Sequence, residues 1–179
     1  MVSLGPVNFG GASDQGGFVV WTNPNNVLAF DAAYATWVVA QTPSNDLRVY
    51  EPALGALPES IILQGIVVEF SGYLDNPSLN VQAEVQLMRL GGLIGNEKTF
   101  SDFGAVGVGN YASLGGASDM WGATLARSDL LLSGSSGFGL HIRFRNFSSP
   151  STTNGRLDHI RMTVYYEEVR RSMQLLGVR

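Results

Sequence analysis

The chain has 179 residues, of which 45% are hydrophobic and 15% are charged, and its formal net charge is −4. This length fits one domain with a sizeable core, and the mild acidity gives no general affinity for nucleic acid or for anionic membranes. The absence of cysteine excludes a disulfide framework and thiolate metal sites. We find neither signal-peptide features at the N-terminus nor an apolar run of the ~20 residues that span a membrane. We therefore expect a soluble protein made in a cytoplasm.

The composition also limits which residues can cover the surface. The charged fraction lies below the usual value of about 25%. The exterior must then be covered by small polar residues such as Ser and Gly, or be partly hidden by a partner. Composition leaves these two alternatives open.

The predicted elements begin with Met1–Gly17, which is rich in Gly and Ser and is expected to be an arm or a poorly ordered lead-in. Apolar and polar residues then alternate with a period of two, which is typical of strands with one buried face. Clusters of Gly, Asn, Ser and Pro separate these runs. The alternation predicts strands at Phe18–Thr22, Tyr34–Ala40, Asp46–Glu51, Ser60–Tyr73, Leu79–Leu90, Phe138–Phe147 and Leu157–Glu167.

The run Ser60–Tyr73 is apolar on both sides. This favours a central strand covered on both faces, or a strand packed against another subunit. The residues between Gly91 and Gly116 are rich in glycine and are expected to form one or two short strands among loops. Arg127–Leu131 predicts one helical turn capped by Ser128.

The last two runs, Phe138–Phe147 and Leu157–Glu167, are predicted to pair as antiparallel neighbours. In the second of them Ile160, Met162 and Val164 are expected to face the core. Beyond Glu167 the period changes, and Val169, Met173 and Leu176 share one face of a short predicted helix. The sequence therefore predicts an all-β antiparallel sandwich at residues 18–167, with an arm at 1–17 and a C-terminal tail at 168–179.

One candidate contact surface is basic. His141, Arg143 and Arg145 alternate along one predicted strand, and Arg161 lies on the next. Such a face suits an acidic protein, a phosphate or a sialic-type sugar, but it is also compatible with a solvated face neutralised by nearby acids. Given the acidic total charge, we favour a solvated face or a protein contact over nucleic acid.

Catalytic and metal-binding patterns are weak in this sequence. His141 and His159 lack a third ligand or a paired base, and there is no Gly-x-Ser-x-Gly motif. Loop residues such as Asp75 and Asp119 have oxygens that suit calcium, although such residues more often cap turns. We therefore predict no enzymatic activity, no metal and no cofactor.

Two aromatic residues are candidates for stacking against a sugar. Trp121 follows a polar loop, and Tyr111 lies in the glycine-rich segment. The alternative for such rings is core filling, which we favour over stacking. Exposure of Trp121, Tyr111 and the loop at Asp75 would favour sugar binding.

Several short motifs, in order along the chain, resemble a pattern of phage virion and tail-associated proteins. The pattern includes W-x-NP-x-N, D-G/A-x-YAT, an LP…GI-x-V segment, GG-x-SDLWG, an FG strand and a final strand ending in TVYY. In this sequence these motifs are Trp21–Val27, Asp31–Thr36, Leu57–Val68, Gly115–Gly122, Gly137–Leu140 and Leu157–Tyr166. Ala32 departs from the pattern, where Gly is usual.

This resemblance covers almost all of Phe18–Glu167 and implies a jelly-roll-type β-sandwich. It implies a non-enzymatic structural component of a bacteriophage virion: a capsid decoration or cement protein, or a fibre, collar or baseplate piece. The expected partners are the major capsid protein or other virion proteins and further copies of the chain, with a homotrimer preferred. The alternative is a receptor- or carbohydrate-binding module of a phage fibre or of a cell-surface protein.

Overall fold

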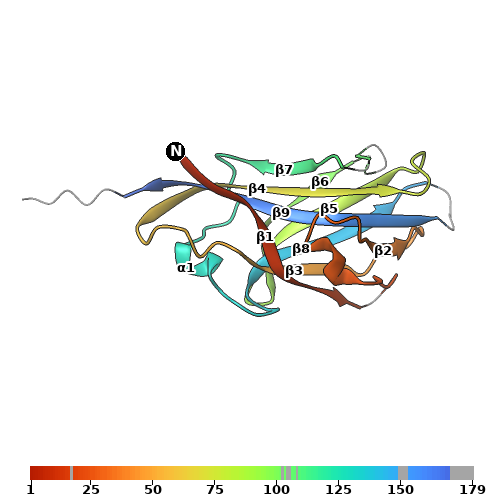
Figure 1. Ribbon diagram of the computed structural model, residues 1–179, viewed down its shortest axis with the longest axis horizontal. Coiled ribbons are helices and arrows are strands. Elements are labelled where there is room, and N and C mark those ends of the chain that lie inside the picture. The colour runs from red at the N-terminus through yellow and green to blue at the C-terminus, as the bar shows by residue number, and fades with distance from the viewer. Residues whose placement is uncertain (17, 102, 104–105, 108, 149–152, 170–179) are drawn as a thin grey trace, which may run out of the picture.

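The computed structural model describes residues 1–179 except 17, 102, 104–105, 108, 149–152 and 170–179. The chain forms an antiparallel β-sandwich of jelly-roll type (Figure 1). The strands are β1 (Val2–Gln15), β2 (Ala35–Val38), β3 (Asp46–Pro52), β4 (Ile61–Leu74), β5 (Val81–Arg89), β6 (Gly92–Phe100), β7 (Ala112–Gly116), β8 (Phe138–Asn146) and β9 (Asn154–Glu168). The short helices are η1 (Pro24–Val27) and α1 (Arg127–Leu130). Across the described residues, no helix has the length and apolar character needed to cross a membrane.

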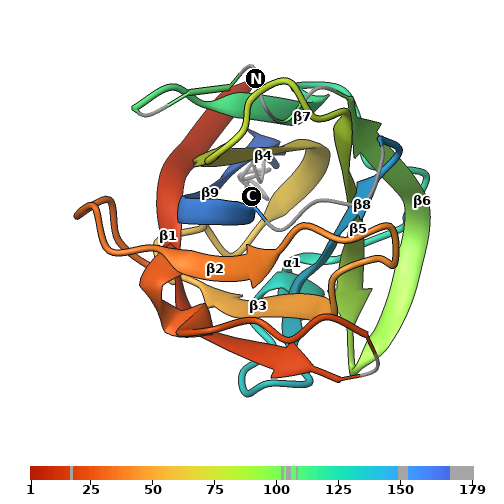
Figure 2. The ribbon, with the colours of Figure 1, turned by 90° about the vertical axis from the view of Figure 1, so that its right-hand side faces the viewer.

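The strands form two sheets. In the first, β9 and β4 pair along most of their length, β7 pairs with β4, and β1 and β2 pair with β9. In the second, the order is β1, β3, β8, β5 and β6. Seen along the long axis, the strands surround a common interior, with β1 on one side and β5 and β6 on the other (Figure 2).

Strand β1 belongs to both sheets. Its first half pairs with β9, and its second half, from Phe9 onward, pairs with β3. Phe9 and Ala12 lie in the core. The prediction that residues 1–17 form an arm is therefore wrong, because Gly and Ser do not prevent strand formation where both halves of a segment find partner strands. Glycine at position 11 even favours this pairing, because a Cβ there would lie 2.3 Å from the ring of Tyr50 on β3.

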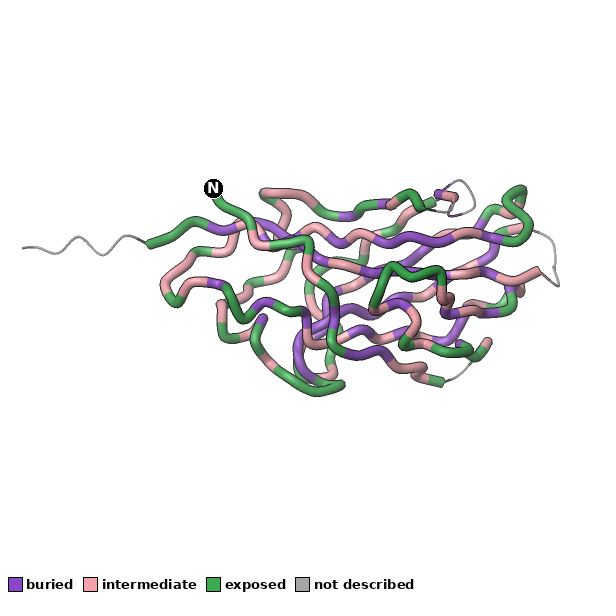
Figure 3. Tube along the Cα trace, in the orientation of Figure 1, coloured by how far each residue is buried: buried purple, intermediate pink, exposed green. Residues whose placement is uncertain are grey.

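The core lies between the sheets and follows the predicted alternation. The expected inward residues of β9, Ile160, Met162 and Val164, are fully buried. Burying such a side chain stabilises the fold by about 1.5–3 kcal/mol. Trp37 of the first sheet stacks on Phe144 of the second, with ring centroids 4.4 Å apart. Figure 3 shows the buried segments along the middle of the molecule and the exposed ones at the turns.

Three further expectations differ from the structure. The predicted strand at Phe18–Thr22 is replaced by isolated bridges, from Val19 to Ser44 and from Thr22 to Thr36. Strands β8 and β9 do not pair, because the chain passes from the second sheet to the first between them. The N-cap of α1 is Ala126 and not Ser128, and the Ala126 N–H donates to Asp129 at 2.8 Å. The predicted C-terminal helix falls mainly on residues 170–179, which lie outside the described residues; β9 itself extends to Glu168.

Candidate functional site

A charged pair lies on the outer face of the first sheet, which points away from the core. Arg161 of β9 stands directly opposite Glu69 of β4. Its Nε and Nη2 donate to the two carboxylate oxygens of Glu69 at 2.9 and 3.0 Å. The guanidinium also lies over the ring of Tyr111, 3.7 Å from its centroid. The arginine is thus fixed by a bidentate ion pair and by cation–π stacking.

A second pair of the same design lies further along the same strands. Arg156 donates through Nε and Nη2 to the two oxygens of Asp75 at 2.7 and 3.0 Å. Its guanidinium lies 5.9 Å from the ring centroid of Tyr73, and Tyr34 packs edge-on against Tyr73. The hydrogen bond from Arg156 lowers the pKa of Asp75, so this carboxylate stays ionised.

Strand geometry places both pairs on one face. Glu69, Ser71 and Tyr73 alternate along β4 and therefore share a side. The partner strand has a bulge at Asp158, where Ser71 stands opposite His159 and the next residue of β4 stands opposite Leu157. Residues five apart on a regular strand would face opposite sides. The extra residue at the bulge shifts the alternation by one, so Arg156 and Arg161 both face outward.

Between the two pairs lies His159. Its Nδ1 is 2.7 Å from the Tyr111 hydroxyl, and its Nε2 is 3.1 Å from Oδ1 of Asn8. Burial lowers the pKa of His159, which favours the neutral imidazole. The ring of Phe30 lies beside both Tyr111 and His159, with 53% of the residue exposed. Phe30 therefore offers solvent an apolar ring next to the polar groups.

The loop that carries Phe30 is held by Asp158. The Ala32 N–H donates to Oδ1 of Asp158 at 3.1 Å. Burial raises the pKa of Asp158, although backbone hydrogen bonds oppose that effect. We call the whole surface the aromatic–arginine face; it consists of Phe30, Tyr34, Glu69, Tyr73, Asp75, Tyr111, Arg156, His159 and Arg161.

The predicted basic face is wrong in one respect. His141, Arg143 and Arg145 do share the outer face of the second sheet, but Arg161 lies on the first sheet. Arg143 and Arg145 both bind the carboxylate of Glu84 at 2.8 Å. The cause of the error is the sheet change between β8 and β9, which no local pattern reveals.

The two histidines are likewise in different sheets. His141 lies 2.9 Å from Asp46 of β3, whereas His159 contacts Tyr111 and Asn8 as described. The loop acids considered for calcium have other partners: Asp119 lies 2.7 Å from Lys98, and Asp75 binds Arg156.

Of the two alternatives for Trp121, the structure confirms core filling, the favoured one, and excludes an exposed stacking ring. Trp121 is fully buried, and its indole N–H donates to the Ile66 carbonyl at 3.0 Å. Tyr111 is half-buried and has the Arg161 guanidinium over its ring. Of the predicted tail residues, Val169 is exposed, and Met173 and Leu176 lie outside the described residues.

Sequence reasoning missed several residues of the aromatic–arginine face, above all Phe30, Glu69 and Tyr73. A signal for Glu69 was present, because it is the charged residue in the otherwise apolar run Ser60–Tyr73. No comparable signal marks Phe30, whose position depends on a loop that folds onto β9.

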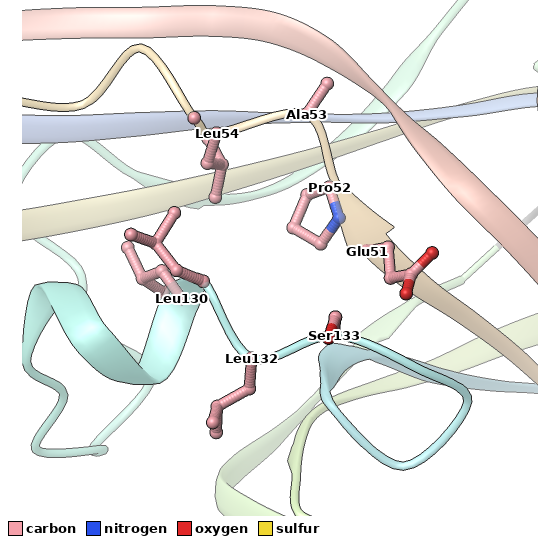
Figure 4. A pocket seen from close by; sticks show the side chains of 9 residues that line it. Glu51, Pro52, Ala53, Leu54, Leu130, Leu132 and Ser133 are labelled. Carbon is pink, nitrogen blue, oxygen red and sulfur yellow. The ribbon is translucent and has the colours of Figure 1, made fainter.

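A pocket of about 230 Å³ lies beside α1 (Figure 4). Leu54, Leu130 and Leu132 form its apolar wall, and the Glu51 carboxylate lies to one side. Oε1 of Glu51 accepts a hydrogen bond from the Gly134 N–H. This lining suits an aliphatic group better than a polyhydroxylated one.

Comparison with protein-family models and with curated proteins finds no match. Among solved structures, the chain is similar to TmCBM61, solved in complex with β-1,4-galactotriose, at 12% identity and a TM-score of 0.40 over 88% of this chain and 93% of that one. It is also similar to the CBM22-1 xylan-binding domain of Paenibacillus barcinonensis Xyn10C, at 12% identity and a TM-score of 0.38 over 91% and 92%. These likenesses are too distant to carry an argument about ligands.

Proposed function

We propose that the chain is a non-enzymatic carbohydrate-binding domain whose ligand lies on the aromatic–arginine face. The observation that carries this proposal is the pair of arginine–carboxylate groups, each beside a tyrosine ring, on one sheet face. Both pairs are partly exposed, with 26% and 21% for Arg161 and Glu69 and 32% each for Arg156 and Asp75.

The chemistry of a sugar matches this surface. A sugar ring has hydroxyl groups that both donate and accept hydrogen bonds, and it has apolar C–H faces. Planar charged side chains fixed in position can bond neighbouring hydroxyls, and an exposed ring such as Phe30 supplies an apolar contact. A rigid sheet holds these groups in place, so little ordering is needed when a ligand binds.

The carboxylates of the face support binding over hydrolysis. Glycoside hydrolysis requires two carboxyl groups on either side of one bond, one of them protonated. Here Glu69 and Asp75 are each engaged by an arginine, and Asp158 is buried and accepts a backbone hydrogen bond.

The test compares two exposed phenylalanines. Phe30→Ala should weaken polysaccharide binding in affinity electrophoresis, whereas Phe147→Ala should not. Phe147 is a matched control because it is 58% exposed and follows β8 of the second sheet. Surface changes of this kind usually alter stability by less than about 0.5 kcal/mol. Equal effects of both variants, or no binding to any polysaccharide tested, would contradict the proposed function.

The second candidate is a structural component of a bacteriophage virion, located on the particle as a homo-oligomer that contacts capsid or other virion proteins. Two observations favour it. One is the ordered series of motifs that resembles phage virion proteins. The other is an apolar tip at the ends of β1, β4 and β9, where Val2, Ile62 and Val169 are 46–55% exposed. Apolar side chains gathered at one end suit a protein interface.

The motif residues support this candidate because they hold the fold. The Trp21 indole N–H donates to the Asn45 carbonyl at 2.9 Å, and the Asn26 side chain donates to the Tyr34 carbonyl. Trp121 binds Ile66 in the same way. A phage virion protein with the same residues at these positions would form the same hydrogen bonds and so the same sandwich.

Electron microscopy of phage particles with and without the protein tests the virion candidate directly. Extra density on the shell, vertex or tail is expected. Deleting residues 170–179 should also reduce self-association, measured by light scattering, more than it lowers the melting temperature. The reverse result, or particles that lack the protein, would contradict this candidate.

A further inference from the structure

The hydrogen-bond donors and acceptors that remain unused on the aromatic–arginine face indicate which class of sugar it can bind. In both pairs the arginine uses Nε and Nη2 for its carboxylate. A guanidinium has five N–H donors, so the Nη1 edge stays available. The two bonds from the arginine use two of the roughly four lone-pair sites of each carboxylate. The Asn154 side chain bonds Asp75 as well, and both carboxylates still keep acceptor capacity. Every pair therefore offers donors and acceptors side by side.

The charges of the two pairs cancel, and Asp31 and Asp158 beside them add no positive charge. Arg156 and Arg161 carry two positive charges, and Asp75 and Glu69 carry two negative ones. An acidic sugar would place a third charge beside each carboxylate, at a cost in repulsion. A neutral pair of adjacent hydroxyls satisfies donors and acceptors without adding charge.

The second sheet provides a contrast. There Arg143 and Arg145 share the single carboxylate of Glu84, which leaves an excess of positive charge. A surface built for acidic ligands would be of that kind. The aromatic–arginine face has one carboxylate for each arginine.

The spacing of the two pairs sets the length of the ligand. Glu69 and Tyr73 are four residues apart on β4, which is about 13 Å at ~3.3 Å per residue. His159, which stands opposite Ser71, lies between the two pairs with Phe30 beside it, and Tyr34 lies at the level of Tyr73. A single sugar ring is too short to reach both groups.

We propose that this face binds a neutral polysaccharide, running along β4 and β9, through adjacent hydroxyl pairs that contact the Arg156–Asp75 and Arg161–Glu69 groups together. This inference rests on the proposed carbohydrate-binding function and adds three properties. The ligand is uncharged, it spans several sugar units, and its binding is insensitive to salt.

The first experiment uses the full chain and calorimetry or affinity electrophoresis. The neutral probes are dextran, mannan and a soluble β-glucan, and the acidic probes are dextran sulfate and polygalacturonate. We expect binding to a neutral probe, little change on raising ionic strength, and affinity that rises from disaccharide to hexasaccharide. Preference for an acidic probe, with loss at high salt, would overturn this inference but leave carbohydrate binding intact. Failure of every probe would overturn both.

The second experiment removes one of the two negative charges of the pairs, which leaves an excess positive charge on the face. Asp75→Asn removes one acceptor and leaves Arg156 without a counter-charge. Affinity for the neutral probe should fall about tenfold, the loss expected for a hydrogen bond to a charged group, and binding to polygalacturonate should appear. Glu69→Gln should act in the same way, so either variant suffices if the other fails to fold.

Asp46→Asn is the matched control for this change. Asp46 pairs with His141 on the second sheet, and its side chain is 32% exposed, as is that of Asp75. Asp46→Asn should change neither the affinity for the neutral probe nor the binding of polygalacturonate. A neutral-probe affinity that is unchanged in both Asp75→Asn and Glu69→Gln would overturn the inference.

Discussion

Replacing Trp121 by Phe should destabilise the fold without a direct effect on ligand binding. The Trp121 ring is fully buried next to β4, and its N–H is bonded to the Ile66 carbonyl at 3.0 Å. Its own carbonyl accepts a hydrogen bond from Asn96 of β6. The residue therefore connects the edge of the second sheet to the first.

The size of the effect follows from these contacts. A buried carbonyl that loses its partner costs about 1–3 kcal/mol, and the smaller ring leaves a cavity that adds about 1 kcal/mol. The unfolding free energy should therefore fall by about 2–4 kcal/mol. In a chain of this size that corresponds to a decrease in melting temperature of roughly 5–15 °C.

Urea unfolding followed by circular dichroism measures this change as a lower midpoint at constant slope. Glycan affinity, measured well below the melting temperature, should stay within twofold of wild type, on the order of 0.4 kcal/mol. A melting temperature equal to that of wild type, combined with lost glycan binding, would refute the placement of Trp121 in the core.

Three further outcomes are expected. Gly139→Ala should destabilise the fold by about 1–3 kcal/mol, because a Cβ there lies 2.0 Å from the Val49 carbonyl, whereas Gly16→Ala meets nothing within 4 Å; equal thermal melts would contradict this. Burial lowers the pKa of His159 below 6.5, so its contribution to stability should be present above that pH and be lost as pH falls through the folded-state pKa. His159→Gln should flatten this part of the stability–pH curve, and an unchanged slope would count against burial as the cause. Ile160→Asp should prevent folding, since it places a charge in the core; a cooperative melt near wild type would show that the assigned face is wrong.

The strands and their buried faces could be predicted from local sequence, because a period of two records which side of a strand avoids water. Within the predicted strand Leu79–Leu90, the alternate residues Val81, Ala83, Val85 and Leu87 are all fully buried. The same information failed for β1, whose Gly and Ser content resembles a loop. Its role depends on β3 and β9, which lie far away in the sequence.

The candidate site was also predictable only in part from local sequence. Alternation placed Arg161 on an outward face, but it gave no indication that Glu69 stands opposite it, more than ninety residues earlier. It also groups Arg161 with His141, Arg143 and Arg145, because strands that follow one another in sequence often pair in space. The sheet change between β8 and β9 separates them.

The sequence by itself determined that this chain is an all-β sandwich with a defined inner face on each main strand. Only the tertiary structure decided which strands are neighbours, and with them the two arginine–carboxylate pairs, the burial of Trp121 and the position of Phe30. The physical reason is that burial is a property of each residue's own strand, whereas pairing depends on contacts between residues far apart in the chain.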